Sequence, residues 1–280
     1  MATVIKPTMT IEKINKLLKN NRDIVFKSGT YELTSKLVAY SDTTITCEKN
    51  VVFKRMHDGR MLQLYVDKDT TGYNGTHNVT WIGGTFIANT NSGNANVIVV
   101  FHCKDIVLRD ITIDSCVGLH SLEINASENV TVNRCKILNQ TAKAGGDFRE
   151  ALQIDFAYKD GLSLGSKVPE DAPCYDGTHC KNLKISDCVF TNCPNGIGTH
   201  TVSYEEQYHE DIDIWGCDFN DIDKYAIKIL GMKNVSVHNC LGGYIIVNKL
   251  KTAHKVVGGK VQLDDYRYNE NVIIDNVSVI

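Results

Sequence analysis

The sequence predicts an all-β solenoid, in which each coil contributes short parallel strands to continuous sheets. The main observation is a recurring phrase of Asn or Asp, then β-branched or aliphatic residues in alternation, often ending in Cys. The phrase begins at Asn78, Asp105, Asn129, Asn182, Asp211, Asn234 and Asn271. The shortest steps are 24 residues (105 to 129) and 23 residues (211 to 234), the length of one unit in a repeat protein. Period-2 alternation indicates strands, and the Leu-x-x-Leu-x-Leu pattern of leucine-rich repeats is absent.

The N-terminal segment predicts a cap on the first coil. Residues 10–21 form an amphipathic helical pattern with Ile11, Ile14, Leu17 and Leu18 on one face, and a strand-like stretch, 23–31, follows. Such a helix covers a sheet end that is otherwise unpaired. We therefore expect an N-terminal cap in residues 1–30 and a solenoid in residues 31–280, with an inserted loop at about 141–180.

The small residues of the phrase have predictable places. Asn and Asp bond their own backbone and tolerate left-handed geometry, so they suit a tight turn at the start of each strand. Four cysteines share one position in the phrase, which predicts an inward stack of thiols: Cys135, Cys188, Cys217 and Cys240. The ten cysteines lack paired spacings, which favours reduced thiols. Cys174, His179 and Cys180 lack a second matched pair, so we expect no metal site and no cofactor.

The register of the repeat predicts a polar patch on one sheet. Aliphatic residues of the strands that precede the phrases point inward, so their neighbours point outward. In-register stacking then gives two outward columns: Val99, Glu123, Gln153, Gly198 and Lys228, and Phe101, Asn125, Asp155, His200 and Leu230. Outward faces of a solenoid are usually polar, so a single Glu or Gln there is ordinarily solvated surface. The concentration of acid, base and amide groups on adjacent coils is what indicates a carbohydrate site.

Further residues lie close to this patch in the sequence. His120, Arg149 and Glu150 come just before the two central strands, and Glu150 is either buried and paired or functional. The 141–180 insertion leaves directly after Asp155, so we expect it to form a wall beside the columns. Asp176, followed by Gly177, is first a turn signal and second a candidate for contact with substrate. Tyr204, in the segment after His200, could stack on a sugar ring from the opposite rim.

The recurring phrase, the capping helix and the Gly-x-Tyr turn at 29–31 resemble the right-handed parallel β-helix proteins of the pectate-lyase superfamily, including phage tailspikes and related depolymerases. Polygalacturonase-like glycosidases of this kind carry Asn-x-Asp, Asp-Asp, Gly-His-Gly and Arg-x-Lys motifs on successive strands. Residues 153–155, 198–200 and 227–229 resemble the first, third and fourth, whereas the paired-Asp motif is missing. The stretches HSLEIN, REALQID, YDGTHC and GIGTHT look more like β-helix proteins of phages and Gram-positive bacteria associated with cell-surface polysaccharide.

Three functions follow from this patch. The first is a glycoside hydrolase acting on a bacterial surface glycan or another complex glycan, with Asp155 and Glu123 as acid and base and His200 and Lys228 holding the sugar. By strand geometry the backbones of Glu123 and Asp155 lie about 8 Å apart. This spacing permits the separation of carboxyl groups that an inverting glycosidase needs. The second is a polysaccharide lyase or epimerase, in which Lys228 or His200 removes a proton from a uronate. The third is a glycan-binding module without catalysis. In each case the substrate contacts include His120, Asn125, Arg149, Glu150 and Gln153.

Composition sets limits on partners and location. The net charge of −3 gives no electrostatic case for binding nucleic acid or an anionic membrane. The N-terminus has no cleavable signal and the chain has no run long enough to span a bilayer. Synthesis in the cytoplasm followed by release through lysis fits a phage or prophage protein of the virion tail. The chain stops on an apolar strand, which favours a truncated chain, a missing partner or an oligomer, and the resemblance to phage β-helix proteins implies a homotrimer.

Overall fold

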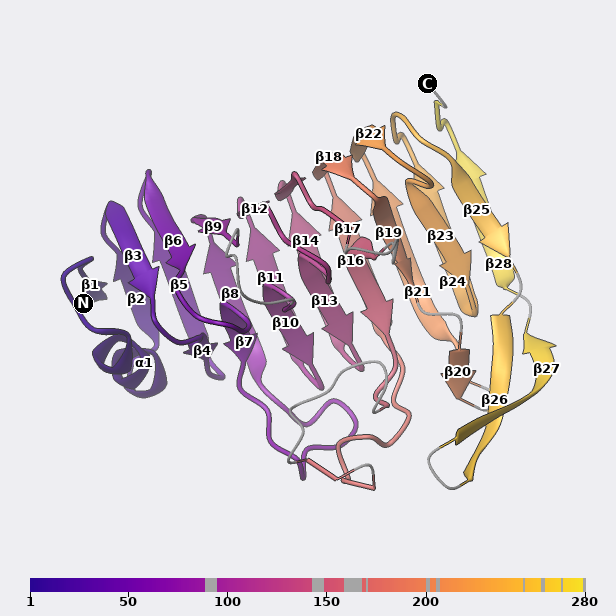
Figure 1. Ribbon diagram of the computed structural model, residues 1–280, viewed down its shortest axis with the longest axis horizontal. Helices are drawn as coiled ribbons and strands as arrows, with labels where there is room; N and C mark the ends of the chain where they lie inside the picture. The colour runs from indigo at the N-terminus through magenta and orange to yellow at the C-terminus, as the bar shows by residue number, and fades with distance from the viewer. Residues whose placement is uncertain are drawn as a thin grey trace.

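The computed structural model is a right-handed parallel β-helix whose coils follow one another in chain order from the N-terminal helix (Figure 1). The structure describes residues 1–88, 95–142, 149–158, 168–169, 171–199, 202–204, 207–248, 250–257, 260–267 and 269–278. Three long sheets, here called A, B and C, run along the described part of the chain, and neighbouring strands within each sheet are parallel. The fold predicted from the repeat is therefore confirmed.

The strands of each sheet come from successive coils. Sheet A contains β1 (Thr3–Ile5), β2 (Asp23–Phe26), β5 (Thr43–Cys47), β8 (His77–Ile82), β11 (Lys104–Arg109), β14 (Glu128–Asn133), β17 (Lys181–Ser186), β21 (His209–Trp215), β24 (Met232–His238) and β28 (Glu270–Asp275). Sheet B contains β3 (Gly29–Leu33), β6 (Val51–Arg55), β9 (Thr85–Ile87), β12 (Thr112–Asp114), β15 (Lys136–Leu138), β18 (Val189–Cys193) and β22 (Asp218–Ile222). Sheet C contains β4 (Leu37–Ala39), β7 (Leu62–Leu64), β10 (Ile98–Phe101), β13 (Leu122–Asn125), β16 (Glu150–Asp155), β19 (Asn195–Thr199), β23 (Ile227–Leu230) and β25 (Ile245–Asn248).

A small fourth sheet lies beside the C-terminal coils (Figure 1). It consists of β20 (Val202–Tyr204), β26 (Leu250–Val257) and β27 (Lys260–Arg267). The strands β26 and β27 pair antiparallel, and β26 also pairs parallel with β20. No helix within the described ranges is long and apolar enough to cross a membrane.

The predicted capping helix is present as α1 (Ile11–Asn20). Thr10 caps its N-terminus by accepting a hydrogen bond from Lys13 N, and Ile11, Ile14 and Leu18 are buried against the first coil. Asn15 then bonds the first strand of sheet C: its Nδ2 donates to Lys36 O and its Oδ1 accepts from Val38 N, both at 2.9 Å. The side chain of Asn15 therefore satisfies backbone groups that an edge strand leaves unpaired.

The turn that opens each sheet A strand from β5 onward is left-handed, as the sequence predicts. Residues at this position have φ between 50° and 58°: Asp42, Asn78, Asp105, Asn129, Asn182, Asp211, Asn234 and Asn271. Their side chains form a ladder from coil to coil, in which Asn129 donates to Asp105 at 2.8 Å and accepts from Asn182 at 2.7 Å. The same residues therefore provide both the turn and contacts between coils.

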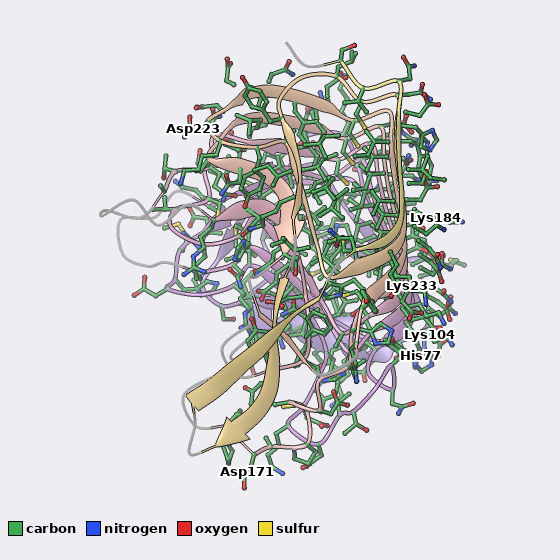
Figure 2. The ribbon with its side chains drawn as sticks, turned by 90° about the vertical axis from the view of Figure 1, so that its right-hand side faces the viewer. His77, Lys104, Asp171, Lys184, Asp223 and Lys233 are labelled. Atoms are coloured by element: carbon green, nitrogen blue, oxygen red, sulfur yellow. The ribbon has the colours of Figure 1, made fainter. Side chains whose placement is uncertain are left out.

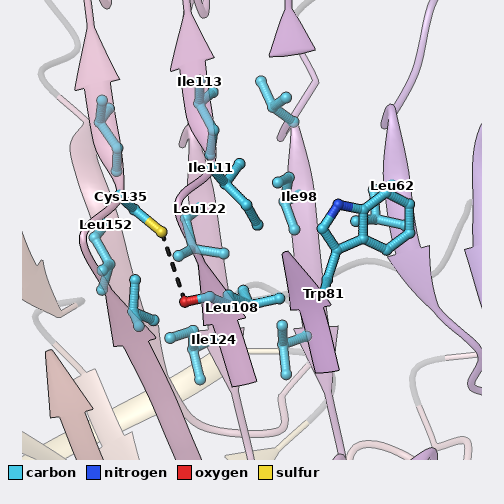
Figure 3. Packing of buried hydrophobic residues seen from close by; sticks show 14 of the residues in the cluster. Leu62, Trp81, Ile98, Leu108, Ile111, Ile113, Leu122, Ile124, Cys135 and Leu152 are labelled. Carbon is cyan, nitrogen blue, oxygen red and sulfur yellow. Dashed lines mark hydrogen bonds between the residues drawn. The ribbon is translucent and has the colours of Figure 1, made fainter. Parts of the chain in front are cut away.

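The core is a column of aliphatic and aromatic side chains enclosed by the three sheets (Figure 3). The predicted cysteine stack lies in it: Cys135, Cys188, Cys217 and Cys240 are all buried, and every cysteine of the chain is a free thiol. Cys135 Sγ donates to Leu108 O at 3.6 Å, on the preceding coil (Figure 3). The thiols thus fill the corner between sheets A and B and bond main-chain carbonyls there.

Candidate active site on sheet C

The register on sheet C is the one that the repeat predicts. Glu123 pairs with Val99 on one side and Gln153 on the other, and Gln153 pairs with Gly198. Asn125 pairs with Asp155, so Glu123 and Asp155 lie on a diagonal between neighbouring strands. Ile197 pairs with Ile227, which places Lys228 beside Gly198. His200 lies outside the described residues.

The outward columns are buried beneath loops and are not solvated surface. Glu123, Asn125, Gln153 and Asp155 are each 0% exposed. Apolar residues that face outward from sheet C pack there with described residues of the 141–180 insertion, in a second apolar cluster that contains Val99, Phe101, Ala126, Ala157, Ala172, Cys174 and Tyr175. The insertion therefore covers the columns as well as lying beside them.

Each of the two diagonal carboxylates accepts hydrogen bonds from neutral donors, and the charge of Glu123 also acts on the Arg60 guanidinium, where it opposes the lowering of the Arg60 pKa by burial. Glu123 Oε1 accepts from Asn125 Nδ2 at 2.9 Å, and Glu123 Oε2 accepts from Asn96. Asp155 Oδ2 accepts from Gln153 Nε2 at 3.1 Å, and its Oδ1 accepts from the Phe156 N–H at 2.8 Å. Asn125 Oδ1 is buried and has no hydrogen-bond partner within the described residues. A buried acceptor of this kind is a feature that a bound hydroxyl would satisfy.

Glu150 forms a second, more strongly paired centre two residues before Leu152. Its Oε1 accepts from Lys228 Nζ at 2.5 Å and from Tyr225 OH at 2.6 Å, and its Oε2 lies 3.9 Å from His120 Nδ1. Burial acts to raise the pKa of Glu150, but Lys228 and His120, together with the hydrogen bonds, outweigh it and lower the pKa to about 2. Burial, and then the charge of Glu150, raises the pKa of Tyr225. Glu150 is therefore an ionised carboxylate at neutral pH.

Gly198 makes room for this ion pair. A Cβ at position 198 would lie 3.0 Å from Glu150 Cγ and 3.2 Å from Lys228 Cε. Gly198 stands between Gln153 and Lys228 in the outward column, so the missing side chain lets Lys228 reach across β19 to Glu150. The side chain of Lys228 remains 16% exposed.

The remaining predicted site residues lie in three different places in the fold. Asp176 ties two loops together, because its Oδ2 accepts from Gly72 N at 2.7 Å and its Oδ1 accepts from Thr178 N at 2.9 Å. Arg149 is partly exposed just before β16. Tyr204 ends β20 and pairs with Ala253 of β26, and its side chain lies outside the described residues. The sequence prediction of Asp176 as a turn residue is thus confirmed.

Two partners in the site were missed in the sequence. Tyr225 occupies the same place in its coil as Glu150, two residues before an inward aliphatic residue, so the count that singled out Glu150 could have found it. Asn96 sits before β10, where its Oδ1 accepts from His120 N at 3.0 Å. Its sequence context is an Asn-rich stretch that gives no such signal. Among the described residues, no group of three or more His, Cys, Asp or Glu is placed to hold a metal ion.

Comparisons with known proteins bear on the fold. No protein-family model and no curated protein matches the chain. Two structures of the surface adhesin PfbA of Streptococcus pneumoniae are similar, with TM-scores of 0.72 and 0.74 and identities of 17% and 16%. They cover 96% and 99% of this chain, and 67% and 78% of the adhesin chains.

Polysaccharide hydrolases are also similar. An ι-carrageenase of A. fortis matches with a TM-score of 0.57 and 14% identity, over 85% of this chain and 53% of the enzyme. The catalytic domain of a GH87 α-1,3-glucanase matches with a TM-score of 0.54 and 10% identity, over 99% of this chain and 53% of that domain. The chain thus spans about half the length of either hydrolase structure. At these identities the likeness establishes the class of protein by fold, a parallel β-helix.

Proposed function

We propose that the chain is a glycoside hydrolase that acts on a polysaccharide, with Glu123 and Asp155 as its general acid and base. The observation that carries the proposal is the presence of two buried carboxylates on adjacent strands of sheet C. The fold does not require acids there, because Val99 occupies the position of Glu123 one coil earlier, and Phe101 occupies the position of Asp155 two coils earlier. Burying a carboxylate is costly unless it is compensated, and ionisable groups concentrated in this way mark functional sites.

The backbone positions of Glu123 and Asp155 are compatible with an inverting reaction. The diagonal between Glu123 and Asp155 is about 8 Å between backbones by strand geometry. Inversion requires two carboxyl groups roughly 6.5–9.5 Å apart, one to protonate the leaving oxygen and one to activate water. Glu150 does not serve as the acid, because its pKa of about 2 leaves it ionised at neutral pH. Glu150 and Lys228 instead form an ion pair beside the two proposed catalytic carboxylates.

Hydrolysis by this pair also requires movement of the covering loops. Glu123 and Asp155 have no exposed surface. The segments 65–76 and 171–178 are held together by Asp176, which accepts from Gly72 N, and by Cys174, which donates through its backbone N–H to Lys68 O at 3.0 Å. In the proposed reaction these two segments move apart to admit the sugar.

Two other functions are distinguished by particular contacts. A glycan-binding module without catalysis would leave Glu123 and Asp155 covered as they are here. A lyase or epimerase with Lys228 as base is disfavoured, because Lys228 donates to Glu150 at 2.5 Å and is not free to accept a proton. The phage association and the homotrimer remain predictions.

Depolymerisation of a panel of bacterial surface and acidic polysaccharides tests the proposal. The wild-type protein is compared with Asp155→Asn and Glu123→Gln, which keep the side-chain shapes, and with the surface variant Glu48→Gln as a control. New reducing ends from wild type and Glu48→Gln, lost in both site variants, support hydrolysis. Products that absorb in the ultraviolet through a new double bond indicate a lyase instead. If the polysaccharide is bound but not fragmented, and both site variants bind it as tightly as wild type, the protein is a binding module without catalysis.

A further inference from the structure

Asn195 belongs to the polar surface around the ion pair of Glu150 and Lys228. It is the first residue of β19 and pairs in register with Glu150 of β16. The next residue, Gly196, faces the core, because a Cβ there would lie 2.9 Å from Cε1 of buried Phe219. Alternation along the strand then directs Asn195 to the outer face. Lys228 crosses the same strand to reach Glu150, so Asn195 lies beside the ion pair.

Two asparagine side chains of sheet C hold amide oxygens that are buried and unpaired. Asn125 and Asn195 are 0% and 1% exposed, and neither Oδ1 has a hydrogen-bond partner within the described residues. The amide of Asn125 is oriented by Glu123, whose Oε1 accepts from its Nδ2 at 2.9 Å, so the oxygen is the atom left over. Native proteins keep few such groups, because a buried acceptor without a donor is destabilising. A ligand that donates a hydrogen bond would supply the missing partner.

The chemistry of these two acceptors selects an uncharged ligand. An amide oxygen only accepts, so it needs an O–H or N–H donor. A carboxylate or sulfate group carries acceptors alone and would set one negative atom against another. The hydroxyl of a neutral sugar donates to an amide oxygen and can also accept, for example from Lys228 Nζ, whose side chain remains 16% exposed.

The cations near these asparagines are already engaged by carboxylates of the protein. Lys228 Nζ donates to Glu150 at 2.5 Å, and the charge of Glu123 acts on the Arg60 guanidinium. An acidic sugar would have to compete with Glu150 for Lys228 or with Glu123 for Arg60, and both carboxylates would repel it. The electrostatics therefore favour the same class of ligand as the unpaired amide oxygens.

We propose that Asn125 and Asn195 bind hydroxyl groups of the glycan, and that the sugars held between them are neutral, without uronate or sulfate groups. The inference rests on the proposed function for its choice of site. The two asparagines lie two strands apart, because β16 separates β13 from β19 (Figure 1). Their register partners, Asp155 and Glu150, stand at the two ends of β16, roughly 16 Å apart. This span is longer than one sugar ring, so the ligand is a neutral oligosaccharide or polysaccharide.

Paired glycans that differ only in charge test the inference. Polygalacturonate is compared with its carboxyl-reduced form, and a sulfated galactan with its desulfated form, because each pair shares chain length and linkage. Neutral α- and β-glucans complete the panel, and affinity electrophoresis measures binding. We expect wild type to bind a neutral glycan, and to bind the uncharged member of each pair at least as tightly as the charged one. Tighter binding of a charged member, or no binding of any neutral glycan, overturns the inference.

The variant Asn195→Ala separates recognition from a structural role. Because Asn195 Oδ1 has no partner to lose among the described residues, we expect the urea midpoint of unfolding to stay unchanged or to rise. Binding of the neutral glycan should weaken about tenfold, as the loss of one hydrogen bond implies. Asn220→Ala, at an exposed asparagine of β22 on sheet B, is the matched control and should change neither quantity. Equal affinity in wild type and Asn195→Ala would mean that only water meets this oxygen, which overturns the inference, as does a lowered midpoint.

The outcomes also separate this inference from the proposed hydrolase. Binding of a neutral glycan that depends on Asn195, without new reducing ends, contradicts the hydrolase alone. Cleavage of an acidic polysaccharide that is unchanged in Asn195→Ala contradicts this inference alone. The comparison of paired glycans needs no variant, so it decides the question if Asn195→Ala does not fold.

Discussion

At the scale of the residue, Glu150 is a buried carboxylate that is stable because its charge is fully paired. Lys228 supplies an ammonium at 2.5 Å, Tyr225 a hydroxyl at 2.6 Å, and His120 a ring nitrogen at 3.9 Å from the second oxygen. Removing one member of such a pair leaves an uncompensated charge, which is more costly than the pair itself is stabilising.

We therefore predict a pH-dependent effect of Glu150→Gln. The pKa of Glu150 falls from its ordinary 4.5 to about 2 in the folded protein, so its contribution to stability is present above pH 4.5 and disappears as the pH falls towards 2. The shift corresponds to roughly 3 kcal/mol. Urea unfolding should show wild type more stable than Glu150→Gln by about this amount at pH 7, with a smaller gap at pH 3. A gap of equal size at both pH values would contradict the assignment.

Glu48 provides a matched comparison. Hydrogen bonds from Lys27 and from Ser28 N also lower the pKa of Glu48, but this carboxylate lies at the surface. Water and salt screen such pairs strongly. Glu48→Gln should consequently change stability much less than Glu150→Gln at every pH.

For single residues of the site, the alternation in the sequence predicts only which face of the strand each side chain occupies. The sequence indicates that Glu123, Gln153 and Asp155 face outward, because inward aliphatic residues flank them. It does not reveal that they are buried, because the cover comes from apolar residues such as Ala172, Cys174 and Tyr175 in an irregular insertion. Contacts made by a loop without periodicity leave no pattern in the sequence.

At the scale of the element, the ladder of left-handed Asn and Asp residues joins local and long-range structure. Asn129 has a φ of 56° and hydrogen bonds with Asp105 and Asn182 on the neighbouring coils. The same side chain thus supports an unfavourable backbone conformation and ties adjacent turns to one another.

Substitutions at Asn129 separate these two effects. Asn129→Gly removes the ladder bonds but accepts a positive φ, so we expect a loss of about 1 kcal/mol. Asn129→Ala also places an ordinary side chain in a left-handed conformation, so the loss should reach about 2 kcal/mol. Equilibrium urea unfolding of both variants at neutral pH measures the difference. Equal losses would show that the ladder, and not the backbone conformation, dominates.

A second feature at this scale is an alternating column of charges at the start of the sheet A strands. From β8 to β28 the paired residues are His77, Lys104, Glu128, Lys181, Glu210, Lys233 and Glu270, and His77, Lys104 and Lys233 lie along one side of the molecule (Figure 2). Ion pairs join Lys104 to Glu128 at 2.9 Å and Lys233 to Glu270 at 3.4 Å. Exposed pairs add little stability, but opposite charges directly facing one another favour this register over a shifted one.

At the scale of the whole molecule, the solenoid was predictable because the same sequence pattern recurs in successive coils. The left-handed turn residues and the inward aliphatic residues recur, so an error at one coil does not alter the fold. The small sheet of β20, β26 and β27 was not foreseen: the antiparallel pairing of Leu250–Val257 with Lys260–Arg267 belongs to an insertion that follows no repeat. The structure was therefore predictable where the chain repeats and not where it departs from the repeat.

The two ends of the solenoid differ in how well the last coil is covered. At the N-terminal end, Ile14 and Leu18 of α1 are fully buried against the first coils. At the C-terminal end, apolar side chains of the last described coils are between 43% and 65% exposed: Leu241, Tyr244, Val247, Ile273 and Ile274. Because each coil contacts chiefly its neighbours, local opening should begin at the less covered end.

Hydrogen exchange measured by mass spectrometry tests this gradient. We expect backbone amides of β25 and β28 to exchange fastest among the strands of sheets A and C, and those of β13, β14 and β16 slowest. Ile14→Ala, which creates a cavity under the cap and costs about 2–5 kcal/mol, should speed exchange in β2 and β4 and leave β24 unchanged. Faster exchange in every coil of this variant would instead mean that the solenoid opens as one cooperative unit, in which the cap stabilises the far end as much as its own.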